Sequence, residues 1–521
     1  MILTCNFSFF VLNFNFSTMI SKINSGAILG LDAAKVEVEV DINPGLAAIT
    51  VVGLPDVAVQ ESRERVKSAI KNSGFKFPHS RITINLAPAD IKKEGPCYDL
   101  PIAVGVIAAS GQVKLDTEKC VFAGELALNG DVRHISGVLP ITIFAASGGF
   151  KKLFIPKINT KEASMVSGVE IIPVENFKQV IDYLSGKIKI APYKSKGFSF
   201  QRSAKTDYDM AYIKGQEHAK RALEIAASGA HNVIMVGPPG SGKTLLARSM
   251  PSIMPPLTEK EAIEVTKIYS ISGVLNAANP FIFERPFRSP HHSSSAIALV
   301  GGGQFPKPGE ISLAHRGILF LDELPEFPRH VLENLRQPLE DGIVTIARAQ
   351  GSLTFPAKFS LIASMNPCPC GFFGDPHHEC RCSFSQINKY QKKISGPLLD
   401  RIDLFIEVPA VKFERLTAND DEESSEKARE RVVAAREIQN KRFSASRASS
   451  NSEMSPEMIK KFCRMEEKAE DLLHHALSQF HLSARAYHRL IKISQTIADL
   501  AGSEKIKIEH LAEALQYRAK N

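Results

Sequence analysis

NVIMVGPPGSGKTLLAR, residues 232–248, is the stretch that decides the fold of the central part of this chain. It predicts an apolar strand, a glycine-rich loop and a helix in that order, which is the context that a phosphate-binding loop requires. The glycines let backbone N–H groups turn toward phosphate oxygens, and the helix N-terminus favours negative charge. A chance glycine-rich turn is the alternative, and it does not explain this order. The predicted nucleotide-binding residues are Gly237, Pro238, Pro239, Gly240, Ser241, Gly242, Lys243 and Thr244.

The same pattern predicts partners for ATP and for magnesium. Lys243 is expected to reach the β- and γ-phosphates, and Thr244 to ligate Mg²⁺. Further along, GILFLDE (317–323) predicts a buried strand that delivers two carboxylates to its carboxyl end, where ligands bind in open α/β sheets. We expect Asp322 to hold Mg²⁺ through water and Glu323 to orient and polarise the attacking water. The position of this pair after a phosphate loop makes the pattern specific.

Three further side chains are candidates for catalysis. Asn366 ends the predicted strand FSLIASMN, where its amide is expected to position the lytic water; a turn-forming role is the alternative. Arg401 precedes the apolar strand LFIEVP and is a candidate arginine finger for a neighbouring subunit; an ion pair with a nearby aspartate is the alternative. Arg485 begins a predicted helix, from which it either reaches phosphate from a lid domain or lies on a solvated face.

The apolar runs of the central region predict a parallel sheet covered on both faces, and hence an α/β fold. Other parts of the chain differ in composition, and they define the remaining domains. The predicted organisation is a mis-called or disordered extension (1–18), a domain of mixed strands and helices (19–190), a linker (191–207), an ATPase core (208–410) with a cysteine-rich insert (366–383), a flexible linker with a helix (411–455) and an all-α lid domain (456–521).

The bulk composition is that of an ordinary globular protein. Of 521 residues, 44% are hydrophobic and 23% charged, so the chain can bury several cores. A net charge of +8 is only a weak indication of an anionic partner. The first 18 residues lack the basic segment and cleavage site of a signal peptide, and no stretch is long and apolar enough for a membrane span. We therefore expect a cytoplasmic protein without a membrane partner.

Four of the eight cysteines, Cys368, Cys370, Cys380 and Cys382, lie within one short segment. A secreted disulfide framework would be spread through a small domain, whereas one tight cluster indicates a metal site in a reducing compartment. Four thiolates can close a tetrahedral structural Zn²⁺ site, and His377 or His378 are candidates to replace one of them. An iron–sulfur cluster, two disulfides and four free thiols are the alternatives.

The motifs GPPGSGKT, FRSPHHSSSAIALVGGG, GILFLDELPEF, ASMNPCPCG, GPLLDRIDL and LSARAYHR, in this order, resemble those of magnesium-chelatase-like AAA+ ATPases, in particular the ComM/YifB branch. The resemblance extends from Met19 to the C-terminus. It implies a homo-hexameric ring ATPase with nucleotide between subunits, Arg401 acting in trans and the C-terminal helices as the lid. It also implies branched or single-stranded DNA as a sequence-independent partner, and a branch-migration helicase activity in recombination or natural transformation.

The family also resembles the replicative MCM helicases in carrying a hairpin before the strand that here ends at Asn366. IVTIARAQGSLTFPAKFSL (343–361) has two β-type segments around a glycine-containing turn. Arg348 or Lys358 is expected to face a phosphate backbone, which would give salt-dependent binding. An ordinary surface hairpin is the alternative.

The N-terminal region resembles the protease domain of Lon-type proteins, which implies an α+β fold. The match is carried by KKEGPCYDLPIAVGVIAASGQV and, downstream, LNGDVRHISGVLPITIFAA. Lon-type peptidases use a Ser–Lys dyad, and here Cys97 and Ala145 stand at the serine and lysine positions. Lys92 and Lys93 lie nearby, but the base is missing, so we expect the fold without protease activity.

Three functions remain open at this point. The first is a DNA-translocating motor, favoured by the family resemblance, the hairpin and the mild positive charge. The second is a chelatase-type motor that inserts a metal into a tetrapyrrole, although such subunits normally lack this N-terminal domain. The third is an ATP-dependent protease or protein remodeller, of which the lost dyad argues only against the protease.

Overall fold

The computed structural model describes most of the chain as two compact units, Met1–Phe198 with Leu275–Pro280, and Ser199–Val274 with Phe281–Asn521. The predicted extension 1–18, most of the predicted linker before Tyr208, His377 and the side chain of Arg348 lie outside the described residues. The residues described are 20–194, 208–276, 278–303, 306–348, 351–376, 378–411, 422–446, 448–480 and 483–518.

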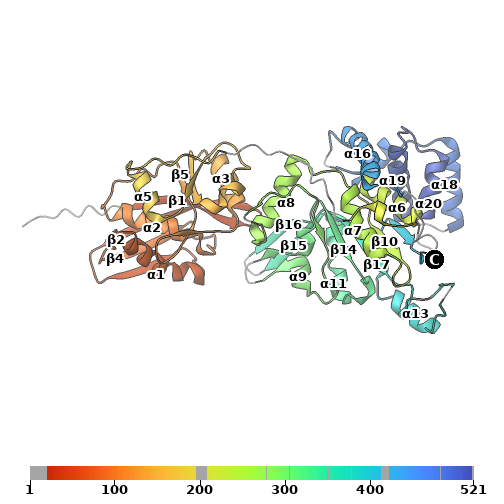
Figure 1. The fold of residues 1–521 in the computed structure, drawn as a ribbon, viewed down its shortest axis with the longest axis horizontal. Coiled ribbons are helices and arrows are strands. Elements are labelled where there is room, and N and C mark those ends of the chain that lie inside the picture. Colours follow the sequence, from red (N-terminus) through yellow and green to blue (C-terminus); the bar gives the residue numbers. More distant parts are fainter. Residues whose placement is uncertain are drawn as a thin grey trace, which may run out of the picture. The chain divides into compact units, whose positions relative to one another are not determined.

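The first unit is built on a mixed sheet. Within its described residues, this sheet has seven strands in the order β3-β4-β2-β1-β5-β8-β9 (Figure 1). The strands β1 to β2 and β2 to β4 pair antiparallel, and the other neighbours pair parallel. The strands are β1 (Ser21–Leu29), β2 (Asp32–Asn43), β3 (Ala48–Val52), β4 (Arg81–Ala87), β5 (Cys120–Phe122), β8 (Lys152–Pro156) and β9 (Glu170–Val174).

Apolar and charged residues alternate along β2, so that one face of the sheet is buried in the core of the unit. Val36, Val38 and Val40 are fully buried, whereas the glutamates between them are not. The helices cover the sheet. Helix α2 is apolar on nearly all sides, and it is accordingly buried between other elements. The remaining elements of this unit are α1 (Val57–Asn72), α2 (Asp99–Ala109), α3 (Val138–Ser147), α4 (Thr160–Ala163), α5 (Phe177–Leu184), and the short pair β6 (Glu125–Leu126) and β7 (Val132–Arg133).

The second unit is centred on a parallel sheet, as the apolar runs predict. In its described part, five strands pair in the order β11-β14-β17-β10-β18. Because all strands point the same way, the segments that follow β10, β14 and β17 emerge at one edge of the sheet. The strands are β10 (Val233–Val236), β11 (Phe287–Arg288), β14 (Ile318–Leu321), β17 (Ser360–Met365) and β18 (Leu404–Glu407).

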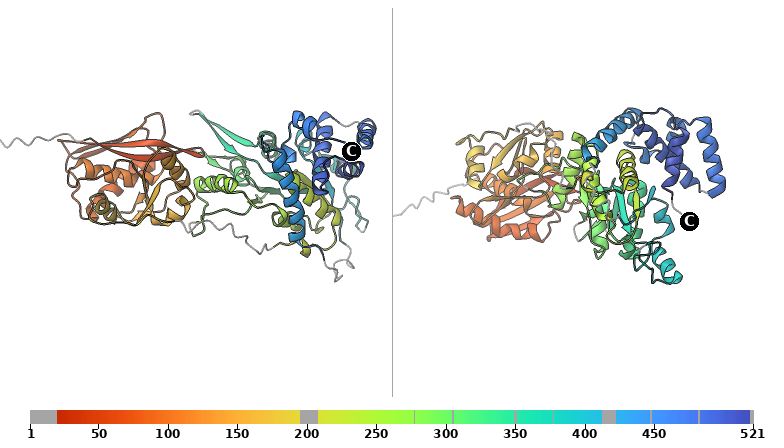
Figure 2. Two further views of the ribbon diagram at one scale, coloured as in Figure 1. Left: turned by 90° about the horizontal axis from the view of Figure 1, so that it is seen from above. Right: turned by 45° about the vertical axis from the view of Figure 1, so that its right-hand side comes forward.

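Helices surround this sheet, and two small hairpins extend from it. The hairpin of β15 (Ile343–Arg348) and β16 (Gly351–Pro356) pairs antiparallel and projects from the sheet (Figure 2). The other elements are α6 (Glu217–Gly229), α7 (Lys243–Ile253), α8 (Glu259–Ser272), α9 (Ala296–Val300), β12 (Gly301–Gly302), β13 (Lys307–Pro308), α10 (Glu310–Leu313), α11 (Arg329–Glu333), α12 (Arg336–Asp341), α13 (Phe384–Gln391) and α14 (Gly396–Leu399).

The C-terminal helices share one hydrophobic core with the parallel sheet. Val233 of β10, Ile491 of α19 and Leu511 of α20 belong to the same buried cluster. A bidentate ion pair also joins α16 to α19, with Arg442 on the fully buried carboxylate of Asp499. These helices are α16 (Ser425–Arg442), α17 (Pro456–Phe462), α18 (Glu467–Phe480), α19 (Ala484–Leu500) and α20 (Ile508–Gln516).

The α/β fold class predicted from the sequence is thereby confirmed, including the all-helical C-terminus. The lid packs with the ATPase core in one compact unit, and the finer domain boundaries stay a prediction. In the described part of the chain, no helix combines the length and the apolar composition needed to cross a membrane.

Candidate functional site

The phosphate loop lies between β10 and α7, at the carboxyl edge of the parallel sheet. Its first residue, Gly237, must lack a side chain, since a Cβ there would lie 2.0 Å from the carbonyl oxygen of Val408. Gly240 and Gly242 have φ values of +75° and +89°, a region that glycine enters without steric cost. The sequence therefore uses three glycines for two different reasons, close backbone approach and left-handed turns.

Lys243 is buried within the loop and folded back onto it. Its Nζ donates to the carbonyl oxygens of Gly237 and Pro238 at 2.7 and 2.8 Å, and to Asn366 Oδ1 at 3.3 Å. Burial lowers the pKa of Lys243, although Asp322 and Glu323 act in the opposite sense. The amine is thus held beside the residues predicted to surround the nucleotide phosphates, and Asn366 is brought to it from β17.

The predicted magnesium residues are in direct contact. Thr244 Oγ1 donates to Asp322 Oδ2 at 2.9 Å. A hydroxyl and a carboxylate are the hard oxygen donors that suit Mg²⁺, usually completed by water and phosphate oxygens. The residues present therefore fit the ion, and Thr244 and Asp322 are the groups that would hold it.

Ser364, near the carboxyl end of β17, is a positioning residue that the sequence reasoning missed. Its hydroxyl donates to Asp322 Oδ1 and accepts the backbone N–H of Glu323 at 3.2 Å. It therefore fixes both members of the carboxylate pair. The available signal was a serine just before the carboxyl end of the strand FSLIASM, which is apolar apart from Ser360 and Ser364.

Glu323 adopts a left-handed backbone conformation, with φ of +53°. Such a conformation costs a non-glycine residue about 1 kcal/mol or more, and it turns the chain sharply after β14. The carboxylate is half exposed, and His292 Nδ1 lies 3.8 Å from its Oε2. His292 belongs to the PHHSSS motif and was not among the predicted site residues; its signal was the adjacent histidine pair.

Arg401 and Arg485 do not join this group. Arg401 contacts the carboxylate of Glu340 and donates to the carbonyl oxygen of Pro397 at 2.6 Å. Arg485 lies 3.9 Å from both Glu340 and Asp400. Arg401 precedes β18, so both arginines lie at the amino edge of a parallel sheet whose carboxyl edge carries Lys243. The structure brings the two arginines together and keeps them apart from the phosphate loop of their own chain.

The four clustered cysteines have the geometry of one tetrahedral site. Cys368 Sγ lies 3.4 Å from Cys370 Sγ and 3.7 Å from Cys380 Sγ, and all four sulfurs lie within 4.8 Å of one another. With Zn–S bonds of about 2.3 Å, the edges of a tetrahedron of sulfurs are about 3.8 Å. Backbone N–H groups of Phe372 and Arg381 lower the pKa of the Cys370 thiol, whereas the neighbouring sulfurs raise the pKa of Cys380 and Cys382, as expected for thiols held close together. The donor set therefore fits zinc.

His378 lies outside this sulfur group. It is 3.5 Å from Asp375 and stacks on Phe372, so the structure favours four thiolates over three thiolates and a histidine. The helix α13, in which this segment ends, stands away from the sheet (Figures 1 and 2).

The cysteine loop packs directly on the phosphate loop. A Cβ at Gly371 would lie 2.5 Å from Pro239 Cδ and 3.9 Å from Asn366 Cγ. Gly371 has φ of +88°, which itself favours glycine. Any displacement of the cysteine loop is therefore transmitted to two predicted nucleotide-site residues.

In the first unit, Cys97 borders the hydrophobic cluster that contains Ala145. Burial raises the pKa of the Cys97 thiol to about 12, and its Sγ lies 3.9 Å from the carbonyl oxygen of Glu94. The amine of Lys93 is buried and donates to the carbonyl oxygen of Pro88.

In the second unit, Lys358 was expected to face a DNA backbone. It instead pairs with Glu453 at 3.0 Å, at the foot of the β15–β16 hairpin.

The phosphate loop, the Asp–Glu pair and the parallel sheet define a P-loop nucleotide-binding protein of AAA+ type. In agreement, the chain matches the family described as magnesium chelatase, subunit ChlI, over residues 209–416 and 38–159, and its C-terminal part over 422–518. The chain belongs to the magnesium-chelatase-like AAA+ family that includes ComM and YifB. Membership of this family suggests ATPase activity that uses ATP and Mg²⁺.

Curated relatives support that assignment along nearly the whole chain. Competence protein ComM of Haemophilus influenzae is 46% identical over 502 residues, which cover 95% of this chain and 97% of that protein. The uncharacterized protein YifB of Escherichia coli is 43% identical over 504 residues, covering 96% and 97%. A Lon protease of Mesomycoplasma hyopneumoniae is 29% identical over 183 residues, covering 33% and 21%.

Replacement of Gly371 by alanine should impair ATP turnover, because the new methyl group collides with Pro239. Gly374→Ala is the matched control: its φ of +80° imposes the same backbone strain, but nothing lies within 4 Å of its Cβ. We expect Gly371→Ala to lower kcat/KM for ATP by about tenfold or more, and Gly374→Ala by less than about twofold. Equal effects of the two substitutions on steady-state ATP hydrolysis would contradict the packing argument.

Metal analysis should find about one zinc per chain in protein purified without chelator. Cys380→Ser and Cys382→Ser should each reduce that content well below one. Cys97→Ser, which changes a thiol outside the cluster, should leave the zinc content unchanged. Iron in place of zinc, or wild-type protein without metal, would be the contrary result.

Proposed function

We propose that this chain is an ATP-hydrolysing subunit of a homo-hexameric ring that moves DNA, with each active site completed by a neighbouring subunit. The observation that carries the proposal is the separation of the two halves of the site. Lys243, Asp322 and Glu323 lie at the carboxyl edge of the parallel sheet, and Arg401 lies at its amino edge. A strand of four residues spans about 13 Å, so no rotamer of Arg401 crosses the sheet to its own phosphate loop.

In this assembly each residue has a defined role. Lys243 and the loop amides bind the phosphates, and Thr244 and Asp322 hold Mg²⁺. Glu323 orients the attacking water, and Asn366, linked to Lys243, positions it near the γ-phosphate. Mg²⁺ supplies charge neutralisation as ATP is cleaved. Arg401 and Arg485 together stabilise the transition state in the neighbouring subunit, after exchanging Glu340 for phosphate.

DNA is the proposed substrate of the motor. The β15–β16 hairpin projects from the sheet and is suited to contact a phosphate backbone, and the relative from Haemophilus influenzae is named a competence protein. The pairing of Lys358 with Glu453 assigns Lys358 to the foot of this hairpin rather than to DNA. Branched or single-stranded DNA would be bound without regard to sequence, in support of branch migration.

We further propose that the first unit is not a protease and that the cysteine cluster holds a structural zinc ion. A thiol whose pKa is raised to about 12 is protonated at neutral pH, and protonated thiols are poor nucleophiles. The lysine of the dyad is replaced by the fully buried Ala145. Zinc, for its part, would hold the loop that packs on Pro239 and Asn366.

Mixing of two inactive variants tests the shared site. Lys243→Ala and Arg401→Ala should each reduce ATP hydrolysis by about 10³-fold, because one removes the phosphate contact and the other the neighbour's cation. When equal amounts are mixed and assembled, about one quarter of the interfaces regain both residues, and activity should return toward that fraction. Arg429→Ala serves as the matched arginine control and should retain wild-type turnover. Absence of recovery in rings shown to contain both variants would contradict action in trans.

DNA should stimulate ATP hydrolysis several-fold, since a DNA-translocating motor hydrolyses ATP faster when DNA is bound. The comparison uses a single-stranded oligonucleotide, a branched substrate and linear duplex, with strand displacement on the branched substrate as a second readout. Glu323→Gln should bind ATP and DNA but show neither activity, which excludes a contaminating ATPase. If no DNA form stimulates hydrolysis and an unfolded protein does, the remodelling alternative replaces the DNA motor; stimulation only by a chelatase partner would favour the metal-insertion alternative.

A further inference from the structure

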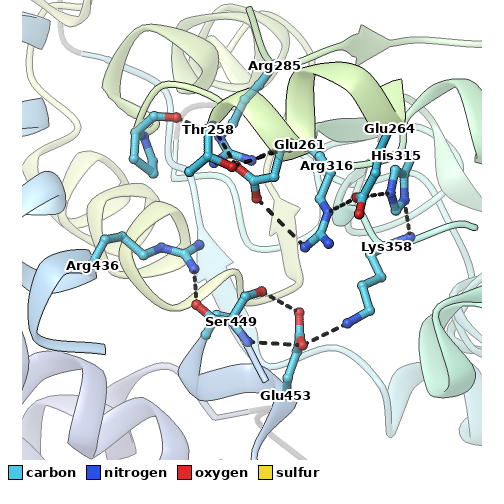
Figure 3. A network of polar contacts seen from close by, with 12 residues as sticks. Thr258, Glu261, Glu264, Arg285, His315, Arg316, Lys358, Arg436, Ser449 and Glu453 are labelled. Carbon is cyan, nitrogen blue, oxygen red and sulfur yellow. Dashed lines mark hydrogen bonds and ion pairs between the residues drawn. The ribbon is translucent and has the colours of Figure 1, made fainter. Parts of the chain in front are cut away.

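The amino edge of the parallel sheet carries a cavity of about 570 Å³. It is lined by residues that precede the strands, such as Asn232 and Gly317, and by parts of α8, α16, α19 and the segment Ser449–Glu453. Gly342 and Lys358, at the foot of the β15–β16 hairpin, also line it, as does Arg401. Figure 3 shows a network of polar contacts that includes several of the lining side chains, among them Arg285, Lys358 and Arg436.

Several of the cations in this cavity are compensated by carboxylates. Glu261 lies 3.3 Å from Arg285 and 3.7 Å from Arg316, and Glu264 is 3.1 Å from Arg316. Lys358, as described above, pairs with Glu453. The network in Figure 3 thus holds these three cations in place from α8 and from the segment before α17.

Two further cations, Arg436 and Lys492, are held by carbonyl oxygens and make no direct ion pair in the described part of the chain. Arg436 of α16 donates to the carbonyl oxygens of Ser449 and Ala227 at 3.2 and 3.1 Å, and its buried Nε has no acceptor. Lys492 of α19 donates to the carbonyl oxygen of Ser452 at 2.8 Å. Among the residues that the structure describes, no carboxylate lies within 4.0 Å of either cation.

The electrostatic environment makes this arrangement costly without a ligand. Burial and the nearby Arg285 lower the pKa of Arg436 to about 10, although Glu261 and Glu453 act in the opposite sense. Burial also lowers the pKa of Lys492, against the opposing effect of Asp403 and Glu453. Six cations and five carboxylates line the cavity: Arg285, Arg316, Lys358, Arg401, Arg436 and Lys492 against Glu261, Glu340, Asp341, Asp403 and Glu453. Of these carboxylates, Glu340 contacts Arg401 and Asp341 is exposed, whereas Asp403 accepts the backbone N–H of Asn232 at 2.9 Å and acts on Lys492 from beyond direct contact. A bound anion would supply the acceptor that the buried Nε of Arg436 lacks and the direct counter-charge that Arg436 and Lys492 lack.

We propose that this cavity binds a small phosphorylated anion, from pyrophosphate to a nucleoside polyphosphate, on Arg436 and Lys492. Guanidinium groups match the paired oxygens of phosphate, and the volume is that of a small-molecule pocket. The site is distinct from the phosphate loop, which lies at the opposite edge of the sheet. The bound anion would join α16, α19 and the hairpin foot beside Arg401, and it would therefore regulate the arrangement that presents Arg401 to the neighbouring subunit.

Binding of labelled inorganic pyrophosphate to the full chain tests this site. The chain carries Lys243→Ala so that the phosphate loop does not contribute. Equilibrium dialysis at fixed ionic strength should show saturable binding of about one pyrophosphate per chain, and the melting temperature should rise with pyrophosphate but not with sodium chloride. Addition of Arg436→Gln or Lys492→Gln should weaken binding by at least about tenfold, since each removes a charge-assisted contact.

Lys441→Gln is the matched control, because it removes an exposed cation of α16 outside the cavity and should leave binding unchanged. Lys492→Gln keeps the test decisive if Arg436→Gln unfolds, since Arg436 also supports two backbone carbonyls. The proposal is overturned if the Lys243→Ala chain shows no saturable binding, or if Lys492→Gln binds as well as its parent. It is also overturned if a ten-nucleotide single-stranded DNA binds at Arg436 and Lys492 and pyrophosphate does not.

Discussion

The direction of the strands in the parallel sheet is the constraint on which the rest of the second unit depends. β10 pairs with both β17 and β18, so everything that follows these strands gathers at one edge and everything that precedes them at the other. Asn232 fixes the amino edge: it accepts the backbone N–H of Leu361, donates to the carbonyl oxygen of Arg401, and donates its own N–H to Asp403. A side chain that belongs to the amino edge, such as Arg401, therefore cannot reach the phosphate loop of its own chain at the carboxyl edge. Dependence of hydrolysis on assembly would then be a consequence of topology.

The carboxyl edge gains its precision from close backbone contacts. The carbonyl oxygen of Val408 leaves no room for a side chain at Gly237. In the same way, Pro239 leaves no room for a side chain at Gly371 of the cysteine loop. Packed interiors transmit displacements instead of absorbing them, so a metal-bound cysteine loop would stabilise the phosphate loop and Asn366 together. The bidentate pair of Arg442 and Asp499 has a comparable role in the lid, because a buried carboxylate without its partner is strongly destabilising.

The sequence alone was sufficient to predict features formed by residues that are close together along the chain. The strand–loop–helix order around Lys243, the strand that ends at Asp322, the alternation of β2 and the grouping of four cysteines all follow from short patterns with a physical reason. The sequence was insufficient wherever residues far apart meet. Ser364 beside Asp322 and Lys358 beside Glu453 depend on strand order and on helix packing, which periodicity does not encode. Arg485 illustrates the difference, since its helix was predicted, whereas its neighbour Glu340 could be found only from the fold.

The two edges of the sheet also differ in the groups that surround their buried cations. At the carboxyl edge, the ammonium of Lys243 is shielded by carbonyl oxygens and lies near two carboxylates, and ATP with Mg²⁺ brings both signs of charge to it. At the amino edge, the direct partners of Arg436 and Lys492 are carbonyl oxygens, and carboxylates act on these cations only from beyond contact distance. Carbonyl dipoles solvate a buried cation only in part, so the second edge is electrostatically incomplete in a way that the first is not. Because α16 and α19 carry these cations and also pack on the sheet through one hydrophobic core, an anion bound there would act on the lid and on the position of Arg401 at the same time.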